Sequence, residues 1–110
     1  MAYVAQEQDP FRAIADANRR IMLDAMLREE CTVGQLTDLL GVRQPTVSQH
    51  IRVLRLAGLV EERKVGRNVF YRAAPAELQV VDDWLAKYQA FWMSKLDSLG
   101  RYLARRKRSN

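Results

Sequence analysis

The stretch from Thr32 to Tyr71 predicts two short helices joined by a tight turn and followed by a β-hairpin. Thr32-Val33-Gly34-Gln35 is typical of a capping box, in which a hydroxyl caps the helix and an amide three residues later bonds back. Gly41 is placed to end this helix. Gln44-Pro45 can begin the next one, because proline is tolerated in a first helical turn. This order predicts a helix-turn-helix unit, whose second helix can enter the major groove of DNA.

The second helix divides into an apolar and a polar side. Val47, Ile51 and Leu54 recur at helical spacing and should face the core. The polar side carries amides, hydroxyls and an arginine, which suit base edges and phosphates better than a merely solvated surface would require. We expect two or three of these residues to contact bases and the others phosphate: Gln44, Thr46, Ser48, Gln49 and Arg52. Arg43 stands where a better helix cap would be expected, which suggests a phosphate contact instead.

Residues 59–73 have the chemistry of a β-hairpin. β-branched and aromatic residues flank Val65-Gly66-Arg67-Asn68, where Gly and Asn both tolerate a positive φ. Three basic residues surround this tip, and we expect them to contact the DNA backbone or a minor groove: Arg63, Lys64 and Arg67. An edge hairpin protected by charge against aggregation is the alternative, and both can hold together.

The charge distribution supports a polyanionic partner. Residues 1–42 carry a balance of −3, residues 43–72 of +5 and residues 73–110 of +3. The positive excess therefore begins at the second helix of the unit and continues through the hairpin. Charge alone fits a solvated basic face equally well, but its coincidence with the helix-turn-helix pattern favours nucleic acid.

The two ends of the chain complete a single domain over residues 1–110. A short helix is expected over residues 10–15 and a longer one from Asp16 to about Glu30. Pro75 should start the last helix, which we expect to span residues 75–104 before a basic tail at 105–110. The predicted fold is mainly α with a small β-hairpin (α+β), a winged helix-turn-helix in the order α-α-α-α-β-β-α.

The last helix carries an apolar stripe that is wider than a small core can cover. An uncovered patch of this kind usually marks an interface, and a two-fold homodimer is the commonest arrangement. The alternative is a helix that folds back over its own core. On this helix we expect the dimer face to include Trp84, Leu85, Tyr88, Trp92, Leu96 and Leu99.

Composition excludes several other classes. No apolar run approaches the ~20 residues that a membrane span requires, and residues 1–10 lack a secretory pattern, so we expect a cytoplasmic protein. The single cysteine excludes an internal disulfide framework. Neither a catalytic constellation nor a phosphate-cradling glycine loop is present, so we expect no enzyme and no cofactor. His50, the single histidine, is expected to bond locally or to touch DNA, since it lacks metal-binding neighbours.

Several runs resemble the ArsR/SmtB family of small bacterial winged-helix repressors over about residues 9–103. They are residues 9–16, 19–21, 44–54, 57–60 and 66–71, and the run Gln44–Leu54 is the most specific. The resemblance implies a dimer built by the first and last helices that represses from a palindromic operator. It places Phe11 in the dimer face, with Ile14 as its neighbouring apolar anchor.

Departures from the family pattern argue against metal sensing. Metal-sensing members carry a Cys-x-Cys pair where this chain has Thr32 and Gly34, and Cys31 is one place out of register. The last helix has no histidine or cysteine, so a site for a thiophilic or imidazole-seeking metal lacks ligands. Cys31 lacks a resolving thiol, and the neighbouring Glu29 and Glu30 disfavour a thiolate. Trp84-Leu85 and Phe91-Trp92 resemble the metal-independent branch, whose members often act as autorepressors.

The sequence therefore predicts a dimeric, sequence-specific DNA-binding regulator, a repressor or autorepressor without metal sensing. Its expected partners are double-stranded DNA and a second copy of the chain. An architectural or RNA-binding winged helix with little base readout is the alternative. A protein-interaction module without nucleic-acid binding is a third class, which the basic residues of the second helix and hairpin disfavour. The operator, the regulated genes and any inducer are left open.

Overall fold

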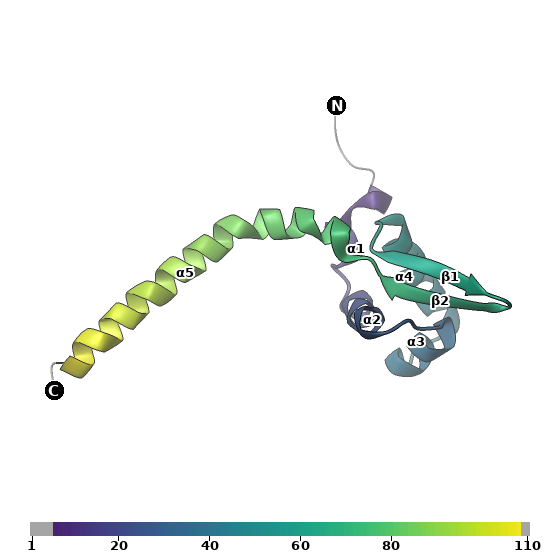
Figure 1. Ribbon diagram of the computed structural model, residues 1–110, viewed down its shortest axis with the longest axis horizontal. Helices are drawn as coiled ribbons and strands as arrows, with labels where there is room; N and C mark the ends of the chain where they lie inside the picture. The colour runs from purple at the N-terminus through teal and green to yellow at the C-terminus, as the bar shows by residue number, and fades with distance from the viewer. Residues whose placement is uncertain (1–5, 109–110) are drawn as a thin grey trace, which may run out of the picture. The chain divides into compact units, whose positions relative to one another are not determined.

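The computed structural model describes residues 6–108, so the first five residues and the end of the predicted basic tail lie outside it. The chain divides into two units, one up to Gln79 and one from Val80, which we describe separately. Figure 1 shows the elements of the first unit and the helix of the second. In the first unit they are η1 (Gln6–Gln8), α1 (Pro10–Ala13), α2 (Ala17–Arg28), α3 (Val33–Leu40), α4 (Gln44–Leu56), β1 (Val60–Val65), β2 (Asn68–Ala73) and η2 (Pro75–Leu78).

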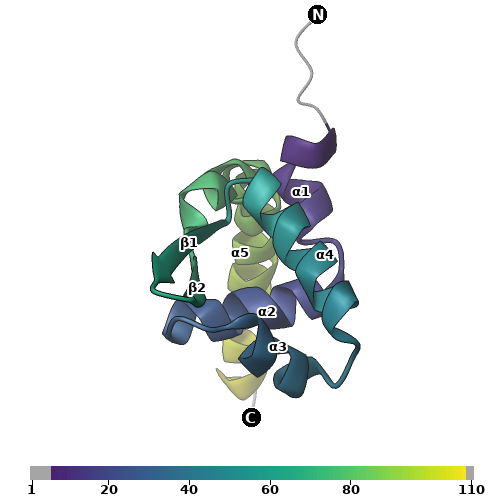
Figure 2. The ribbon, with the colours of Figure 1, turned by 90° about the vertical axis from the view of Figure 1, so that its right-hand side faces the viewer.

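Helices α2, α3 and α4 enclose the core of the first unit (Figure 2). Met22 and Met26 of α2, Leu36 of α3 and Leu54 of α4 are almost completely buried. Val47 and Ile51 are buried beside them, so the predicted apolar side of α4 is confirmed. Each buried side chain of this size stabilises the fold by about 2 kcal/mol, and together they fix which side of α4 faces outward.

Local sequence signals set the boundaries of the helix-turn-helix unit. The Gln35 amide donates to Thr32 Oγ1 at 3.1 Å, and the Thr32 amide donates to Gln35 Oε1 at 2.9 Å, which confirms the capping box. Gly41 takes a left-handed conformation with φ of 66° and ends α3, as predicted. Helix α4 begins at Gln44, and Arg43 makes no side-chain bond to its first turn. Arg43 therefore occupies the cap position without acting as a cap.

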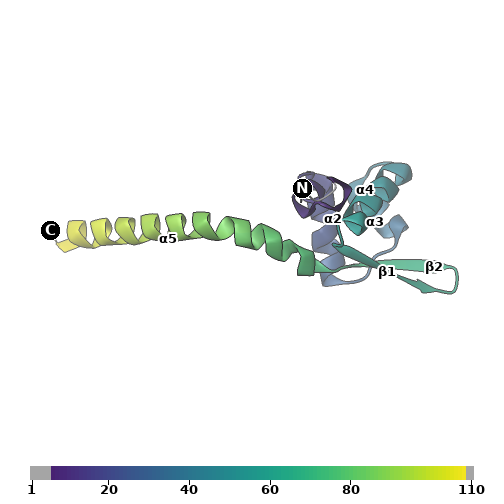
Figure 3. The ribbon, with the colours of Figure 1, turned by 90° about the horizontal axis from the view of Figure 1, so that it is seen from above.

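Strands β1 and β2 pair antiparallel, from Val60 opposite Ala73 to Val65 opposite Asn68. The two-residue loop begins with Gly66 at φ of 60°, which a II′ turn requires of its first position. Asn68 pairs within β2, so of the two residues that tolerate a positive φ only the glycine adopts one. Figure 3 shows the hairpin extending beyond the helices of the first unit. Only Val60 of β1 is buried, whereas Tyr71 and Ala73 of β2 are half-buried against the core. The part of β1 beyond Val60 therefore lacks a core beneath it.

A backbone bridge joins the loop after α2 to β2. The Cys31 amide donates to the Tyr71 carbonyl at 2.9 Å, and the Tyr71 amide donates to the Cys31 carbonyl at 2.8 Å. The prediction that α2 reaches about Glu30 was therefore wrong, since the chain becomes extended at Glu29 to make this pairing. Helix α1 likewise ends at Ala13, because Asp16 adopts extended backbone and caps α2 with its side chain.

The last helix, α5, spans Gln79–Arg108, which corrects the predicted range 75–104 at both ends (Figure 1). Pro75–Leu78 form a separate 3-10 turn, closed by the Gln79 amide on the Ala76 carbonyl. Such turns are common where the first amides of a helix lack partners. At the other end, basic residues 105–108 extend the helix, because cations near a helix C-terminus interact favourably with its dipole. Among the described residues, no helix is both long and apolar enough to cross a bilayer.

Replacing Thr32 with Ala should destabilise the protein by about 1 kcal/mol, because it leaves the first amides of α3 without their capping oxygen. Urea unfolding followed by circular dichroism measures the change. The matched control is Thr32→Ser, which keeps the hydroxyl and should stay within about 0.5 kcal/mol of the natural protein. Equal losses in the two variants would show that the hydroxyl does not cap this helix.

Candidate nucleic-acid interface

The outward side of α4 is polar and unengaged. All five predicted contact residues are exposed: Gln44, Thr46, Ser48, Gln49 and Arg52. Within the described part of the chain, their side chains make no hydrogen bond or ion pair. Because Val47, Ile51 and Leu54 are held in the core, these side chains cannot turn inward. The arrangement leaves donors and acceptors available to an external partner.

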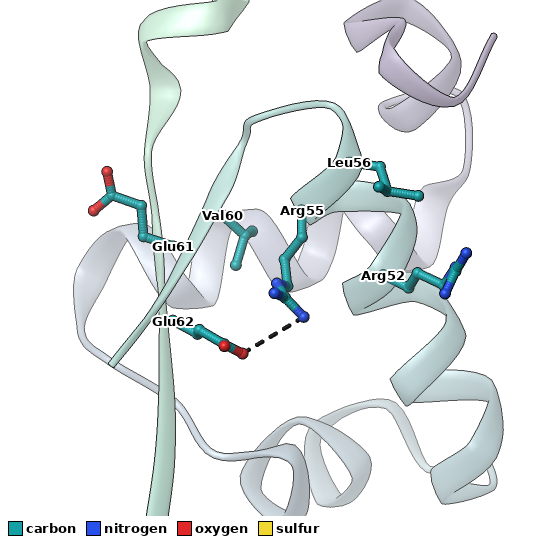
Figure 4. Close-up of a pocket in the computed structure, with 6 residues that line it drawn as sticks. All are labelled: Arg52, Arg55, Leu56, Val60, Glu61 and Glu62. Carbon is teal, nitrogen blue, oxygen red and sulfur yellow. Dashed lines mark ion pairs between the residues drawn. The ribbon is translucent and has the colours of Figure 1, made fainter. Parts of the chain in front are cut away.

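A groove of about 630 Å³ lies between α4 and β1. Figure 4 shows Arg55 on α4 pointing toward Glu62 on β1, and Arg52 on the outer side of the helix. The Arg55 guanidinium lies 3.5 Å from the Glu62 carboxylate. Glu61 turns away from α4 and pairs instead with Arg72 of β2, at 3.0 Å. The Arg55 cation is thus paired with a carboxylate on the other side of the groove, whereas the Arg52 cation lies at the rim.

A smaller hollow of about 150 Å³ lies on the other flank of α4. Glu7 and Arg12 from the N-terminal segment line it, together with Gln49 and Arg52. Arg52 borders both hollows and therefore lies on the outermost ridge of the helix.

Ion pairs reduce the positive excess that the sequence showed for residues 43–72. Four of its seven basic side chains pair with carboxylates: Arg55, Arg63, Lys64 and Arg72. The other three have no such partner among the described residues: Arg43, Arg52 and Arg67. These three arginines lie at the start of α4, on its outer ridge and in the hairpin turn. They form the free positive charge of this surface. For Arg43 this agrees with the phosphate contact that its position before α4 suggests.

The three basic residues predicted for the hairpin tip are not equivalent. Arg67 lies in the turn itself, whereas Lys64 is 4.0 Å from Glu62. Arg63 donates two hydrogen bonds to Glu30, from Nε to Oε1 at 2.9 Å and from Nη2 to Oε2 at 2.6 Å. These bonds lower the pKa of Glu30 and raise that of Arg63. No local sequence pattern indicates this contact, which joins residues 33 positions apart.

His50 is held by α2 and not by a local bond. Arg19 donates from Nε to the Ala13 carbonyl at 2.7 Å and from Nη2 to the Arg12 carbonyl at 3.1 Å. Its Nη1 lies 3.3 Å from His50 Nδ1, and since a guanidinium only donates, this nitrogen accepts when the ring is neutral. One arginine thereby connects α1, α2 and α4. The orientation of α4 depends on this contact as well as on its apolar side.

Cys31 is buried, and its thiol donates to the Glu29 carbonyl at 3.3 Å. Burial is the main cause that raises the pKa of the thiol, and the charge of Glu29 raises it further. This agrees with the expected disfavouring of the thiolate, although burial contributes more than charge. Among the described residues, no three His, Cys, Asp or Glu side chains are grouped as metal ligands would be. The absence of metal sensing stays a prediction.

The residues predicted for a dimer face come from both units. In the first unit, Phe11 is exposed, whereas Ile14 is half-buried against the core. In the second unit, every described side chain from Asp82 to Lys107 is exposed. This includes the predicted set Trp84, Leu85, Tyr88, Trp92, Leu96 and Leu99. Trp92, for example, is 63% exposed.

Comparison with known proteins adds independent information. The model of the family described as "Bacterial regulatory protein, arsR family" matches residues 16–62, which include α2, α3, α4 and the start of β1. A transcriptional repressor SmtB homolog of Synechocystis is 41% identical over 64 residues, or 58% of this chain and 48% of that protein. The match thus spans about half the length of that relative.

Two further matches extend over most of the chain. An HTH-type transcriptional regulator of Mycobacterium tuberculosis is 34% identical over 86 residues, which cover 78% of each protein. An ArsR-like transcriptional regulator from Rhodococcus, a solved structure, superposes with a TM-score of 0.67 at 32% identity. That superposition covers 83% of this chain and 84% of the other. The predicted winged helix-turn-helix fold and the family resemblance are confirmed, whereas membership of a metal-independent branch stays a prediction.

Stability should depend on pH through Asp16, which caps α2 by accepting from the Arg19 amide at 3.1 Å. Burial raises the pKa of Asp16, but hydrogen bonds from the Arg19 and Asn18 amides, together with the charges of His50 and Arg19, outweigh it. The pKa therefore lies below its ordinary value. The charged carboxylate therefore stabilises the fold at pH values above about 4, and this stability is lost as pH falls through the lowered pKa.

Replacing Asp16 with Asn keeps a capping oxygen and removes the charge. We expect the natural protein to be more stable than the variant by about 0.5 kcal/mol near neutral pH. The difference should shrink toward zero as pH falls through the lowered pKa of Asp16. Urea unfolding at a series of pH values measures both quantities. A difference that stays constant across this range would contradict the charge effect.

Proposed function

The chain belongs to the ArsR family of bacterial regulatory proteins, and we propose that it is a dimeric repressor that binds a palindromic DNA operator. The observation that carries this proposal is the outward side of α4, whose polar side chains have no partner among the described residues. Buried contacts on the opposite side of the helix hold them in place.

In this proposal α4 lies in the major groove, and its outer ridge reads bases. Gln49 and Gln44 can each bond in bidentate fashion to an adenine edge, and Arg52 to a guanine edge. Thr46 and Ser48 can donate to bases or phosphates. An established bidentate contact discriminates against a wrong base by about 1–3 kcal/mol. Two such contacts in each subunit would account for a sequence-specific operator.

The unpaired arginines supply the contacts that do not depend on sequence. Arg43 lies at the start of α4, and Arg67 lies in the hairpin turn. In this proposal both contact phosphates beside the outer ridge of α4. Each phosphate neutralised by a cation contributes about −0.9 to the slope of log affinity against log salt concentration. The ion-paired Arg55 and Arg72 would contribute less, because their charge is already compensated by Glu62 and Glu61.

Helix α5 supports the dimer. Its 30 residues make a helix about 45 Å long. At 100° per residue, most of its large apolar residues fall within an arc of roughly 160°. This stripe includes Trp84, Tyr88 and Leu99, all exposed in one chain. A second copy would cover it, and a two-fold dimer would present two copies of α4 to half-sites one helical turn apart.

We further propose that repression does not depend on a metal, since α5 carries no histidine or cysteine. The alternative function is an architectural protein with little base readout, in which the unpaired arginines supply most of the affinity. The two functions differ in their response to substitutions on the ridge of α4, because an architectural protein would lose affinity equally for all sequences.

Replacing Arg67 with Ala should weaken binding to every duplex and flatten the salt slope by about 0.9 per subunit. Replacing Gln49 with Ala should instead change the preference among bases at one position, by about 1–3 kcal/mol. Fluorescence anisotropy on a selected operator and its single-base variants measures both effects. Arg72→Ala, which removes a paired arginine of the same hairpin, is the control and should leave the slope nearly unchanged. Equal effects from the Arg67 and Gln49 changes would favour the architectural alternative.

Replacing Leu99 with Glu should raise the dimer dissociation constant by at least about 100-fold, because it places a charge within the buried stripe. The matched control is Met93→Glu, since Met93 is also exposed on α5 but falls outside the stripe. Sedimentation equilibrium measures both variants. If Met93→Glu dissociates the dimer as strongly as Leu99→Glu, the interface lies on another face.

A further inference from the structure

We infer that Glu30 and Arg63 form a clamp that fixes the direction of the hairpin, so that Arg63 is a positioning residue for DNA binding and not a phosphate contact. This inference rests on the proposed function, because the direction of the hairpin matters only if the hairpin meets DNA. It reverses the role that the sequence predicted for Arg63 and assigns a role to Glu30, an acidic residue on a basic surface.

The clamp crosses the sheet from one edge to the other. Arg63 on β1 lies opposite Phe70 on β2, and its guanidinium sits 5.3 Å from the centre of the Phe70 ring. Beyond β2 it reaches Glu30, to which it donates both hydrogen bonds of 2.9 and 2.6 Å. Glu30 is held there because the next residue, Cys31, is bridged to Tyr71 through the backbone. One side chain thereby connects β1, β2 and the loop after α2.

The hairpin depends on such support. A two-stranded hairpin alone is only marginally stable in water. Tyr71 and Ala73 of β2 pack against the core, but every residue of β1 beyond Val60 is exposed. Exposed ion pairs usually stabilise a protein only slightly. A bidentate pair is the stronger kind, because two parallel bonds restrict its geometry, and the Phe70 ring adds a cation–π contact. We therefore expect the clamp to affect hairpin direction more than global stability.

The position of Arg63 also argues against a phosphate contact. Side chains alternate between the two faces of a strand. Glu62 faces α4 and pairs with Arg55 (Figure 4), so Arg63 lies on the face of β1 turned away from the groove. A phosphate would have to replace a carboxylate that already accepts two bonds from the same guanidinium. Arg67, which lies in the turn and has no partner among the described residues, does not face this competition.

The test compares the removal of two acidic charges from the same surface. Glu30→Gln and Glu61→Gln each remove one negative charge near the hairpin, so simple electrostatics predicts tighter DNA binding for both. If the clamp fixes the hairpin, Glu30→Gln should weaken operator binding by about five-fold. Glu61→Gln breaks an ion pair within the hairpin only, so operator binding should stay unchanged or become tighter. Arg63→Gln should match Glu30→Gln, and the double variant should be no weaker than either single variant.

The salt slope separates positioning from phosphate contact. We expect Arg63→Gln to leave the slope unchanged, whereas a direct contact would flatten it by about 0.9 per subunit. Tighter binding by Glu30→Gln, or a flattened slope in Arg63→Gln, would overturn the inference.

A measurement without DNA keeps the clamp testable if no operator is found. Hydrogen exchange of the Cys31 and Tyr71 amides, which bond across the bridge, should accelerate in Glu30→Gln and not in Glu61→Gln. NMR titration should also show the pKa of Glu30 returning toward its ordinary value in Arg63→Gln. Unchanged exchange in Glu30→Gln would contradict the clamp itself. Absence of specific DNA binding by the natural protein would instead contradict the proposed function.

Discussion

The burial of one side of α4 is the constraint on which the DNA-binding account depends. Val47, Ile51 and Leu54 are almost inaccessible to solvent, and exposing any of them would cost about 2 kcal/mol. Rotation of the helix about its axis is therefore excluded, and the opposite ridge must face outward. The capping box of α3 and the Arg19 contact with His50 add restraints from two other helices. A polar ridge that is fixed in this way can bind DNA with little loss of conformational entropy.

Fewer cations are unpaired on this surface than the net charge of the chain suggests. The net charge is +5, but most of the basic residues between positions 43 and 72 are paired with carboxylates. Arg43, Arg52 and Arg67 have no such partner among the described residues. A surface with few free cations binds DNA only modestly without base contacts, so specificity must come from the ridge of α4. The paired residues instead hold the hairpin beside it.

What could be predicted from the sequence is the structure that neighbouring residues determine. Thr32 and Gln35 are three residues apart, and Gly66 acts within a two-residue loop, so α3, α4 and the hairpin tip followed from local patterns. The Arg63–Glu30 and Arg19–His50 contacts join residues more than 30 positions apart. No local pattern marks such pairs, because they exist only after the chain has folded. The Cys31–Tyr71 bridge explains in the same way why α2 ends early. At the other end of the chain, the predicted basic tail after Ala104 instead continues α5 to Arg108, because its helix propensity and the helix dipole favour continuation.

We propose that the outer ridge of α4 reads base sequence. The most direct measurement is fluorescence anisotropy of the natural protein with the DNA upstream of its own gene and with a scrambled duplex, over a range of salt concentrations. We expect a preference of about 1,000-fold or more. We also expect a salt slope of about −4, since each of two subunits would bring Arg43 and Arg67 to phosphates. Binding without preference to that DNA or to any fragment of the genome, with the same salt dependence, would contradict it.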